Sequence, residues 1–152
     1  RYTRTGSPMK KKRVIGLDVG TKGIGVAISD ELGMCAYPTT TLTRQGVRKD
    51  VQKIEHLIKE RSIGEIVVGL PLELDGREAR SARLARQIGN GLAEATGLPV
   101  LYVDERYTSV EAERQLISAN VSRQRRKAVI DQQAAVLILQ AYLDHGATIT
   151  EK

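Results

Sequence analysis

The first strongly apolar stretch of the sequence contains one carboxylate. Residues 14–19 are Val-Ile-Gly-Leu-Asp-Val, a glycine-rich turn follows at residues 20–23, and a second apolar run covers residues 24–28. This pattern predicts a β-hairpin that opens a buried sheet. An ionised aspartate inside a core strand costs several kcal/mol unless hydrogen bonds or a cation compensate for its lost hydration. Asp18 therefore requires a partner, either backbone amides of the turn, or a divalent metal ion or a phosphate bound to one.

The rest of the pattern predicts alternating helices and strands. A third strand is expected at residues 35–42, where Pro38 indicates an edge strand or a bulge. Residues 66–70 are apolar on both faces, which is typical of a central parallel strand. In chain order, the other elements predicted from the apolar spacing are a helix from residue 47 that ends in a loop at 61–64, a strand at 66–71, a helix at about 77–95, a strand at 100–103, and helices at about 109–119 and 126–145.

These elements predict an α/β fold. Three antiparallel strands followed by alternating helices and strands form a mixed five-stranded sheet, with an antiparallel meander, a parallel half and flanking helices. Ligand sites in such sheets lie at the carboxyl ends of the strands, near the point where the strand order reverses. We expect the first strand to be central and Asp18 to lie beside the end of the fifth strand.

A second carboxylate is expected at that strand end. Asp104 and Glu105 follow the fifth strand, and alternation along a strand directs their side chains to opposite faces. An acidic pair in this position also commonly caps a helix or lies in a solvated loop. We prefer Glu105 as the site residue, and Asp104 remains the alternative.

A third carboxylate is expected from the last helix. Asp131 shares a helical stripe with the apolar residues Ala134, Ala135 and Ile138, which turns it toward the sheet. The small alanines would allow this helix to approach the strands closely. A surface ion pair with Lys127, one turn earlier, is the alternative and contributes only a few tenths of a kcal/mol. Three converging carboxylates favour a site for hard cations bound by oxygen.

Composition indicates an ordinary globular chain, with 41% hydrophobic and 28% charged residues. The 152 residues predict a single domain at residues 9–146, with residues 1–8 an added leader ahead of Met9 and residues 147–152 a tail. No run approaches the ~20 apolar residues of a membrane span. The single cysteine, Cys35, cannot form an internal disulfide, which predicts a cytoplasmic location.

Basic residues exceed acidic ones. Without the two arginines of residues 1–8, the formal net charge falls from +6 to +4, which suits either a polyanionic partner or a solvated surface. One basic cluster, at the start of the Asp131 helix, consists of Arg123, Arg125, Arg126 and Lys127. A second set, Arg77, Arg80, Arg83 and Arg86, advances in three-residue steps and forms a spiral rather than one face. The absence of Phe and Trp favours contacts to a nucleic acid backbone over base recognition.

Several motifs resemble a known family. They are Gly-Leu-Asp-Val-Gly-Thr-Lys at 16–22 with residues 24–30, Val-Gly-Leu-Pro-Leu at 68–72 with residues 75–76, Val-Asp-Glu-Arg-Tyr-Thr-Ser at 103–109, and Ile-Asp-Gln-Gln-Ala-Ala at 130–135 with residues 138–140. In this order, over about residues 13–144, the chain resembles the YqgF/RuvX family of RNase H-like nucleases.

The resemblance implies an RNase H-like fold and metal-dependent hydrolysis of nucleic acid phosphodiesters by an endonuclease. The family's acidic triad corresponds to Asp18, Glu105 and Asp131, which would hold two Mg²⁺ or Mn²⁺ ions. We expect further nucleic acid contacts from Lys22, Arg77, Arg80 and Arg106. Two departures, Gly23 where arginine is common and Glu73 where asparagine is common, are expected to weaken backbone contacts at those points.

Family members are linked to maturation of the precursor of 16S ribosomal RNA, and some to Holliday junction resolution. We favour RNA as the substrate, with branched DNA as the alternative, and expect a monomer or a weak homodimer. Two more remote alternatives are a single-domain relative of the actin and sugar-kinase ATPases, in which Asp18 would serve Mg-ATP, and a ribosome-assembly module without turnover.

Overall fold

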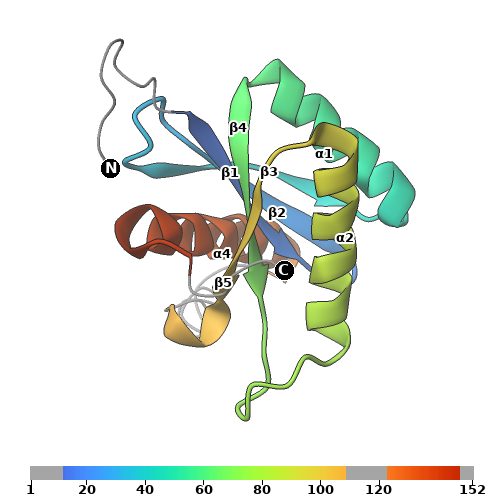
Figure 1. The fold of residues 1–152 in the computed structure, drawn as a ribbon. Coiled ribbons are helices and arrows are strands. Elements are labelled where there is room, and N and C mark those ends of the chain that lie inside the picture. Colours follow the sequence, from blue (N-terminus) through green and yellow to red (C-terminus); the bar gives the residue numbers. More distant parts are fainter. Residues whose placement is uncertain (1–11, 109–122, 148–152) are drawn as a thin grey trace.

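The computed structural model describes residues 12–108 and 123–147, without the side chains of Tyr107 and residues 123–131. Its strands form one mixed sheet in the order β3-β2-β1-β4-β5 (Figure 1). They are β1 (Arg13–Val19), β2 (Gly23–Ser29), β3 (Ala36–Thr43), β4 (Ile63–Leu70) and β5 (Val100–Asp104). β1 is central, with antiparallel β2 on one side and parallel β4 on the other. The predicted fold class is therefore confirmed.

The strand limits differ slightly from the predicted ones, most clearly in β3 and β4. β3 begins at Ala36 and carries the bulge expected at Pro38, where its register against β2 shifts by one residue. β4 begins at Ile63, three residues earlier than predicted, because its pairing with β1 starts there, opposite Arg13. The loop predicted at 61–64 is consequently a shorter turn.

Helices cover both faces of the sheet. They are α1 (Val47–Glu60), α2 (Arg80–Thr96) and α4 (Arg123–His145), and a short 3₁₀ helix, η1 (Glu105–Tyr107), follows β5. α1 and α2 lie side by side on one face, and α4 packs on the other (Figure 1). α4 begins three residues earlier than predicted. The helix predicted at 109–119 lies outside the described residues.

α2 begins at Arg80 rather than at Arg77 because a turn occupies the preceding residues. The Glu73 N–H donates to the carbonyl of Arg77 (2.9 Å), and the Gly76 N–H donates to the carbonyl of Glu73 (2.8 Å). Gly76 has a φ of +90°, a conformation that glycine adopts without strain. Residues 71–79, here called the β4–α2 loop, are thus held by internal hydrogen bonds at their centre.

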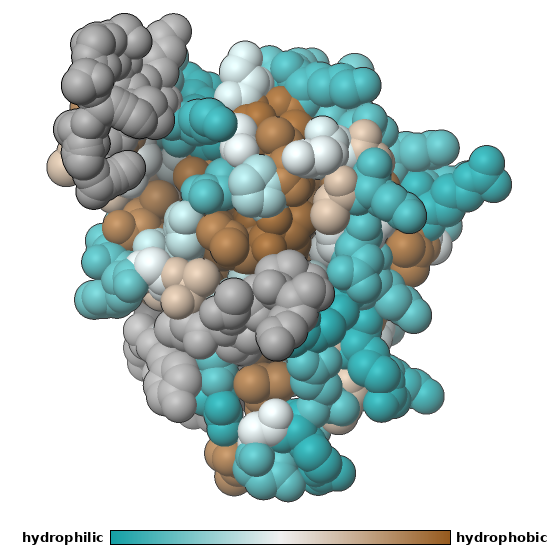
Figure 2. Space-filling view, viewed as in Figure 1, coloured by the Kyte–Doolittle hydropathy of each residue, from teal (hydrophilic) through white to brown (hydrophobic). Residues whose placement is uncertain are grey.

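Strand alternation divides the interior into two apolar cores. Leu17 and Tyr102 pack with α1 and α2 on one face. Val67 and Val103 pack with α4 on the other. Figure 2 shows apolar side chains gathered near the centre of this view of the molecule and hydrophilic ones along the side where α1 and α2 lie. Because Asp18 follows Leu17, its side chain belongs to the α4 face of the sheet.

α4 approaches β1 closely at Gly16, two residues before Asp18. A Cβ at Gly16 would lie 2.6 Å from Cβ of Leu139 and 3.3 Å from the carbonyl oxygen of Ala135. Ala134 and Ala135 are both buried there, so the predicted close approach of this helix is confirmed. The contact sets the distance between α4 and β1, the strand that carries Asp18.

We predict that Gly16→Ala destabilises the protein. Alanine with room for its methyl group would stabilise a strand by up to about 1 kcal/mol relative to glycine, but here the methyl group overlaps Leu139, and overpacking typically costs about 1–3 kcal/mol. Urea unfolding measures the change, with Ser81→Ala, an exposed position on α2, as a control expected within about 0.5 kcal/mol of wild type. An unfolding midpoint for Gly16→Ala equal to that of wild type would show that α4 does not pack as described.

Candidate functional site

Asp18 lies on the central strand with glycine on both sides. Its side chain is 6% exposed. Across β2 its partner is Gly25. On β4, the position after the Leu17–Val68 pair is Gly69. The sheet therefore carries no side chain immediately beside the Asp18 carboxylate on either neighbouring strand, and we call Gly25 and Gly69 the glycine floor.

One expected partner of Asp18 is used elsewhere. The Gly20 N–H, in the turn that follows β1, donates to the carbonyl of Gly23 at 2.9 Å. This bond closes the turn on itself. The amide of Gly20 is therefore not the group that compensates the buried charge of Asp18.

Glu105 reaches the same face of the sheet from η1. A Cβ at Gly69 would lie 2.8 Å from Glu105 Oε2 and would also overlap the Ile138 side chain from α4. The Glu105 carboxylate thus lies over Gly69 of β4, the strand next to the one that carries Asp18. Our expectation that Asp18 lies directly beside the fifth strand is corrected, because β4 separates β1 from β5. Gly69, having no side chain, leaves the space that Glu105 occupies.

Asp104, the alternative to Glu105, is engaged elsewhere. Its carboxylate is 2% exposed and accepts hydrogen bonds from Nε (3.0 Å) and Nη2 (2.6 Å) of Arg106 and from the Arg106 backbone N–H (2.9 Å). Burial is the largest influence and raises the pKa of Asp104, but the hydrogen bonds and charge of Arg106 outweigh it and bring the pKa below its usual value. Of the acidic pair, Glu105 is therefore the residue that lies over the glycine floor.

Arg106 connects the end of β5 to the β4–α2 loop. Besides Asp104, its Nη1 donates to the carbonyl oxygens of Glu73 (3.4 Å) and Leu74 (3.2 Å). The guanidinium that we expected to contact nucleic acid is thus used inside the protein, with its charge matched by Asp104. Glu73, one of the two departures from the family pattern, contributes its backbone to this arrangement.

The third predicted acid is placed only by its backbone. Asp131 is in α4, and its side chain lies outside the described ones. Ala135 and Ile138, at helical offsets of four and seven, are buried against the sheet. Among the residues whose side chains are described, no group of three His, Cys, Asp or Glu residues could hold a metal ion. The role of Asp131 as a ligand therefore stays a prediction.

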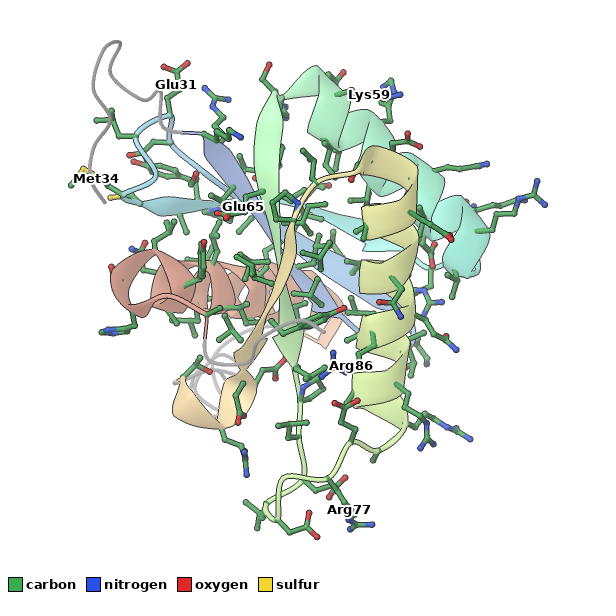
Figure 3. All side chains as sticks on the ribbon, viewed as in Figure 1. Glu31, Met34, Lys59, Glu65, Arg77 and Arg86 are labelled. Atoms are coloured by element: carbon green, nitrogen blue, oxygen red, sulfur yellow. The ribbon has the colours of Figure 1, made fainter. Side chains whose placement is uncertain are left out.

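The predicted basic contacts fall into three groups. Lys22, in the turn after β1, and Arg80, at the start of α2, are exposed. Arg77 pairs with Asp75 at 3.1 Å on the β4–α2 loop, and Arg86 points from α2 toward the sheet (Figure 3). The cluster Arg123, Arg125, Arg126 and Lys127 lies in the first two turns of α4, with side chains outside the described ones.

Arg86, which we had placed in the basic spiral, is occupied inside the fold. It donates to both carboxylate oxygens of Glu78, at 2.9 and 2.8 Å, and its guanidinium carbon lies 4.7 Å from the ring centre of Tyr102. The hydrogen bond from Arg86 also lowers the pKa of Glu78 below its usual value. Arg86 therefore ties α2 to the sheet.

Sequence reasoning missed the glycine floor and the Asp104–Arg106 pair. Glycine inside a strand commonly marks a close approach of another group, so Gly25 and Gly69 carried a usable signal. The Arg106 contacts with Glu73 and Leu74 join residues more than thirty positions apart. Local patterns carry no signal for such a contact.

No helix among the described residues is long and apolar enough to cross a membrane.

Solved structures with a similar fold include two of RuvC. The structure of T. thermophilus RuvC in complex with a Holliday junction substrate has a TM-score of 0.55 and 11% identity, covering 89% of this chain and 95% of that one. A second Thermus thermophilus RuvC structure has a TM-score of 0.50 and 13% identity, covering 89% and 97%. At these identities the likeness establishes the RNase H-like fold alone.

Relatives in sequence are much closer. A protein of Trichormus variabilis named "Putative pre-16S rRNA nuclease" is 48% identical over 130 residues, 86% of each chain. A protein of Moorella thermoacetica with the same name is 46% identical over 132 residues, 87% of this chain and 94% of the relative. The model of the family described as "RuvX: Holliday junction resolvase" matches residues 12–145. The chain with Asp18 and Glu105 over a glycine floor therefore belongs to the RuvX family of nucleases.

Proposed function

We propose that the chain is a metal-dependent endonuclease that hydrolyses RNA, with the precursor of 16S ribosomal RNA as its substrate. The observation that carries this proposal is the position of Asp18 and Glu105 on one face of the sheet, with only glycine beside Asp18 on β2 and β4. The names of the relatives support the choice of substrate. A cytoplasmic location remains a prediction from the single cysteine.

The residues present fit a divalent cation. Both described acids offer carboxylate oxygens, the ligands preferred by Mg²⁺ and Mn²⁺, and Gly25 and Gly69 add no side chain beside Asp18. Asp18, from the rigid central strand, would hold two ions, with Glu105 and Asp131 each completing one. When bound, such a pair activates the attacking water and stabilises the leaving oxygen of an in-line displacement.

The chain's other residues would position the substrate. Neither histidine is placed to act as a general base, since His56 lies on α1, across the sheet from Asp18, and His145 ends α4. Lys127 is one turn before Asp131 on α4. We propose that it binds the phosphate under attack or orients the attacking water. Lys22 is exposed and follows shortly after Asp18 in the chain. We therefore propose that it contacts the nucleic acid next to the cleaved bond.

Asp18→Asn is expected to abolish cleavage of RNA in Mg²⁺ or Mn²⁺ without unfolding the protein, and Glu105→Gln to reduce cleavage strongly. Loss of groups that merely orient metal ligands costs about 10–100-fold, so loss of a ligand should cost more than about 100-fold. Single-turnover cleavage and thermal melting measure the two effects. Undiminished cleavage by Asp18→Asn, or by wild type in excess chelator, would refute the assigned site.

Asp104→Asn, in contrast, is expected to act mainly on stability. The pKa of Asp104 is lowered in the folded state, so its contribution to the free energy of unfolding is present above its unfolded pKa of about 3.9 and is lost as the pH falls through the folded value. Urea unfolding should show a larger difference between wild type and Asp104→Asn at neutral pH than at the lowest pH at which both fold. A difference that grows on acidification would contradict the pairing with Arg106.

The basic cluster at the start of α4 is expected to follow phosphates. Replacing Arg123 and Arg125 by glutamine should weaken binding to all RNA sequences alike. It should also flatten the dependence of log K on log salt concentration by about 0.7 per lost contact for a single strand. Titrations at several salt concentrations measure the slope. An unchanged slope would place the binding surface elsewhere.

Junction resolution is the second candidate function, and two observations favour it. The family description names that activity. Leu74, at the tip of the β4–α2 loop, is 95% exposed, while Arg106 holds its carbonyl. Apolar side chains presented in this way separate base steps in other nucleic acid complexes. Against it, a four-way junction needs two symmetric sites in a dimer, and the chain has no Phe or Trp to separate strands.

A direct comparison separates the two functions. A precursor RNA of the small subunit and a synthetic four-way junction should be offered at equal concentration and physiological salt, with the oligomeric state measured in parallel. We expect cleavage of the RNA by a monomer or weak dimer. Paired symmetric nicks in the junction by a stable dimer, with the RNA left intact, would reverse the assignment.

A further inference from the structure

A groove of about 890 Å³ runs along α1 at the outer edge of the sheet. β3, the last strand on this side of the described sheet, supplies one wall, including Thr39, Thr40 and Leu42. α1 supplies the other, including Leu57. The site with Asp18 lies on the α4 face, whereas this groove opens between α1 and β3.

The groove is basic. Lys49, Lys53 and Arg61 line it, and none of the acidic residues in the described part of the chain does. Within the described part of the chain, none of these three side chains takes part in an ion pair. Three positive charges that are not in ion pairs therefore face the same groove. They equal half of the net charge of +6, although only ten residues line the groove.

The acidic residues of α1 do not neutralise these cations. Asp50 is buried and paired with Arg44, away from solvent. The remaining two pair along the helix, Glu55 with Lys59 at 3.4 Å and Glu60 with His56 at 3.9 Å. Among these partners His56 alone lines the groove, and it is neutral unless protonated. The positive charge of the groove is thus available to a ligand.

The arrangement of the cations indicates the shape of the ligand. Lys49 and Lys53 are one turn apart on the same side of α1, and Arg61 directly follows the last residue of the helix. At 1.5 Å per residue, Lys49 and Arg61 are about 18 Å apart along the helix axis. A row of this length suits a linear polyanion better than one compact phosphate. A positively charged groove that follows the backbone is how proteins bind single strands without sequence preference.

The groove begins at the end of the sheet where the acids lie. β3 runs parallel to β1, since both are antiparallel to β2. The carboxyl ends of β3 and β1 therefore lie at the same end of the sheet. The Arg44 N–H donates to the carbonyl of Lys22 at 3.0 Å, and Nη1 of Arg44 donates to the carbonyl of Gly20 at 3.2 Å. The turn after Asp18 is therefore bonded directly to the segment that enters α1. Lys22, whose side chain is exposed, belongs to this turn.

We propose that this groove binds single-stranded RNA that extends beyond the cleaved bond, with the strand passing Lys22 and continuing along Lys49, Lys53 and Arg61. The inference rests on the proposed nuclease function and adds a second contact surface to it. Contacts here are to the phosphate backbone, so they make binding depend on the length of the strand rather than on its sequence. The groove holds the substrate and takes no part in the chemical step.

The test uses the double variant Lys49→Gln/Lys53→Gln in the full chain. Its matched control is Arg48→Gln/Lys59→Gln, which removes the same charge from α1 at two exposed positions outside the groove; Lys59 lies at the far end of α1 (Figure 3). Both are combined with Asp18→Asn for binding titrations against single-stranded RNA of about 5 and about 20 nucleotides, lengths that bracket typical single-strand sites. Cleavage is measured with the groove variants alone.

We expect the groove variant to flatten the salt dependence for the long RNA by about 1.4, twice the value for one lost contact. KM for the long RNA should rise with kcat unchanged, and the short RNA should be affected little. The control should leave the slope near that of wild type. Equal changes in both variants, or no change in the groove variant while both remain folded, would overturn the proposal. Wild type that binds long RNA through the groove but never cleaves it would refute the nuclease function and leave the groove intact.

Discussion

The structure depends on the burial of a carboxylate at the centre of the sheet. Asp18 is on the middle strand, 6% exposed, where an isolated charge would cost several kcal/mol. A sheet whose only purpose was stability would carry an apolar residue there. Instead, both neighbouring strands place glycine next to it, and at Gly69 a Cβ would overlap Ile138 and Glu105. The sheet thus places no side chain of its own beside this negative charge on either neighbouring strand.

The surrounding elements preserve that space. α4 is seated by its contact with Gly16, which sets its distance from β1. Arg106 and Asp104 fasten the end of β5 to the β4–α2 loop on the other face. Glu105 lies between these two anchored regions and is directed over Gly69. The backbone segments that carry Asp18 and Glu105 are thus anchored by packing and by hydrogen bonds, and such preorganisation lowers the cost of ordering side chains on binding.

The sequence predicted those parts of the molecule that depend on local pattern. The hairpin around Asp18, the central position of its strand and the close approach of Ala134 and Ala135 all follow from periodicity and residue size. The failures involve contacts between distant segments. The start of α2 at Arg80 depends on a turn that Arg106 holds from another strand end, and Gly69 gains its importance only once β4 is known to separate β1 from β5.

The central claim is that Asp18 is retained for a divalent cation, and the most direct measurement is metal-dependent stability. The free energy of unfolding of wild type and of Asp18→Asn should be measured by urea titration with and without Mn²⁺. A ligand at about 100 times its Kd stabilises the folded state by about 2.7 kcal/mol, so wild type should gain stability on addition of Mn²⁺ and the variant should not. An equal gain in both proteins, or none in either at millimolar Mn²⁺, would contradict the account.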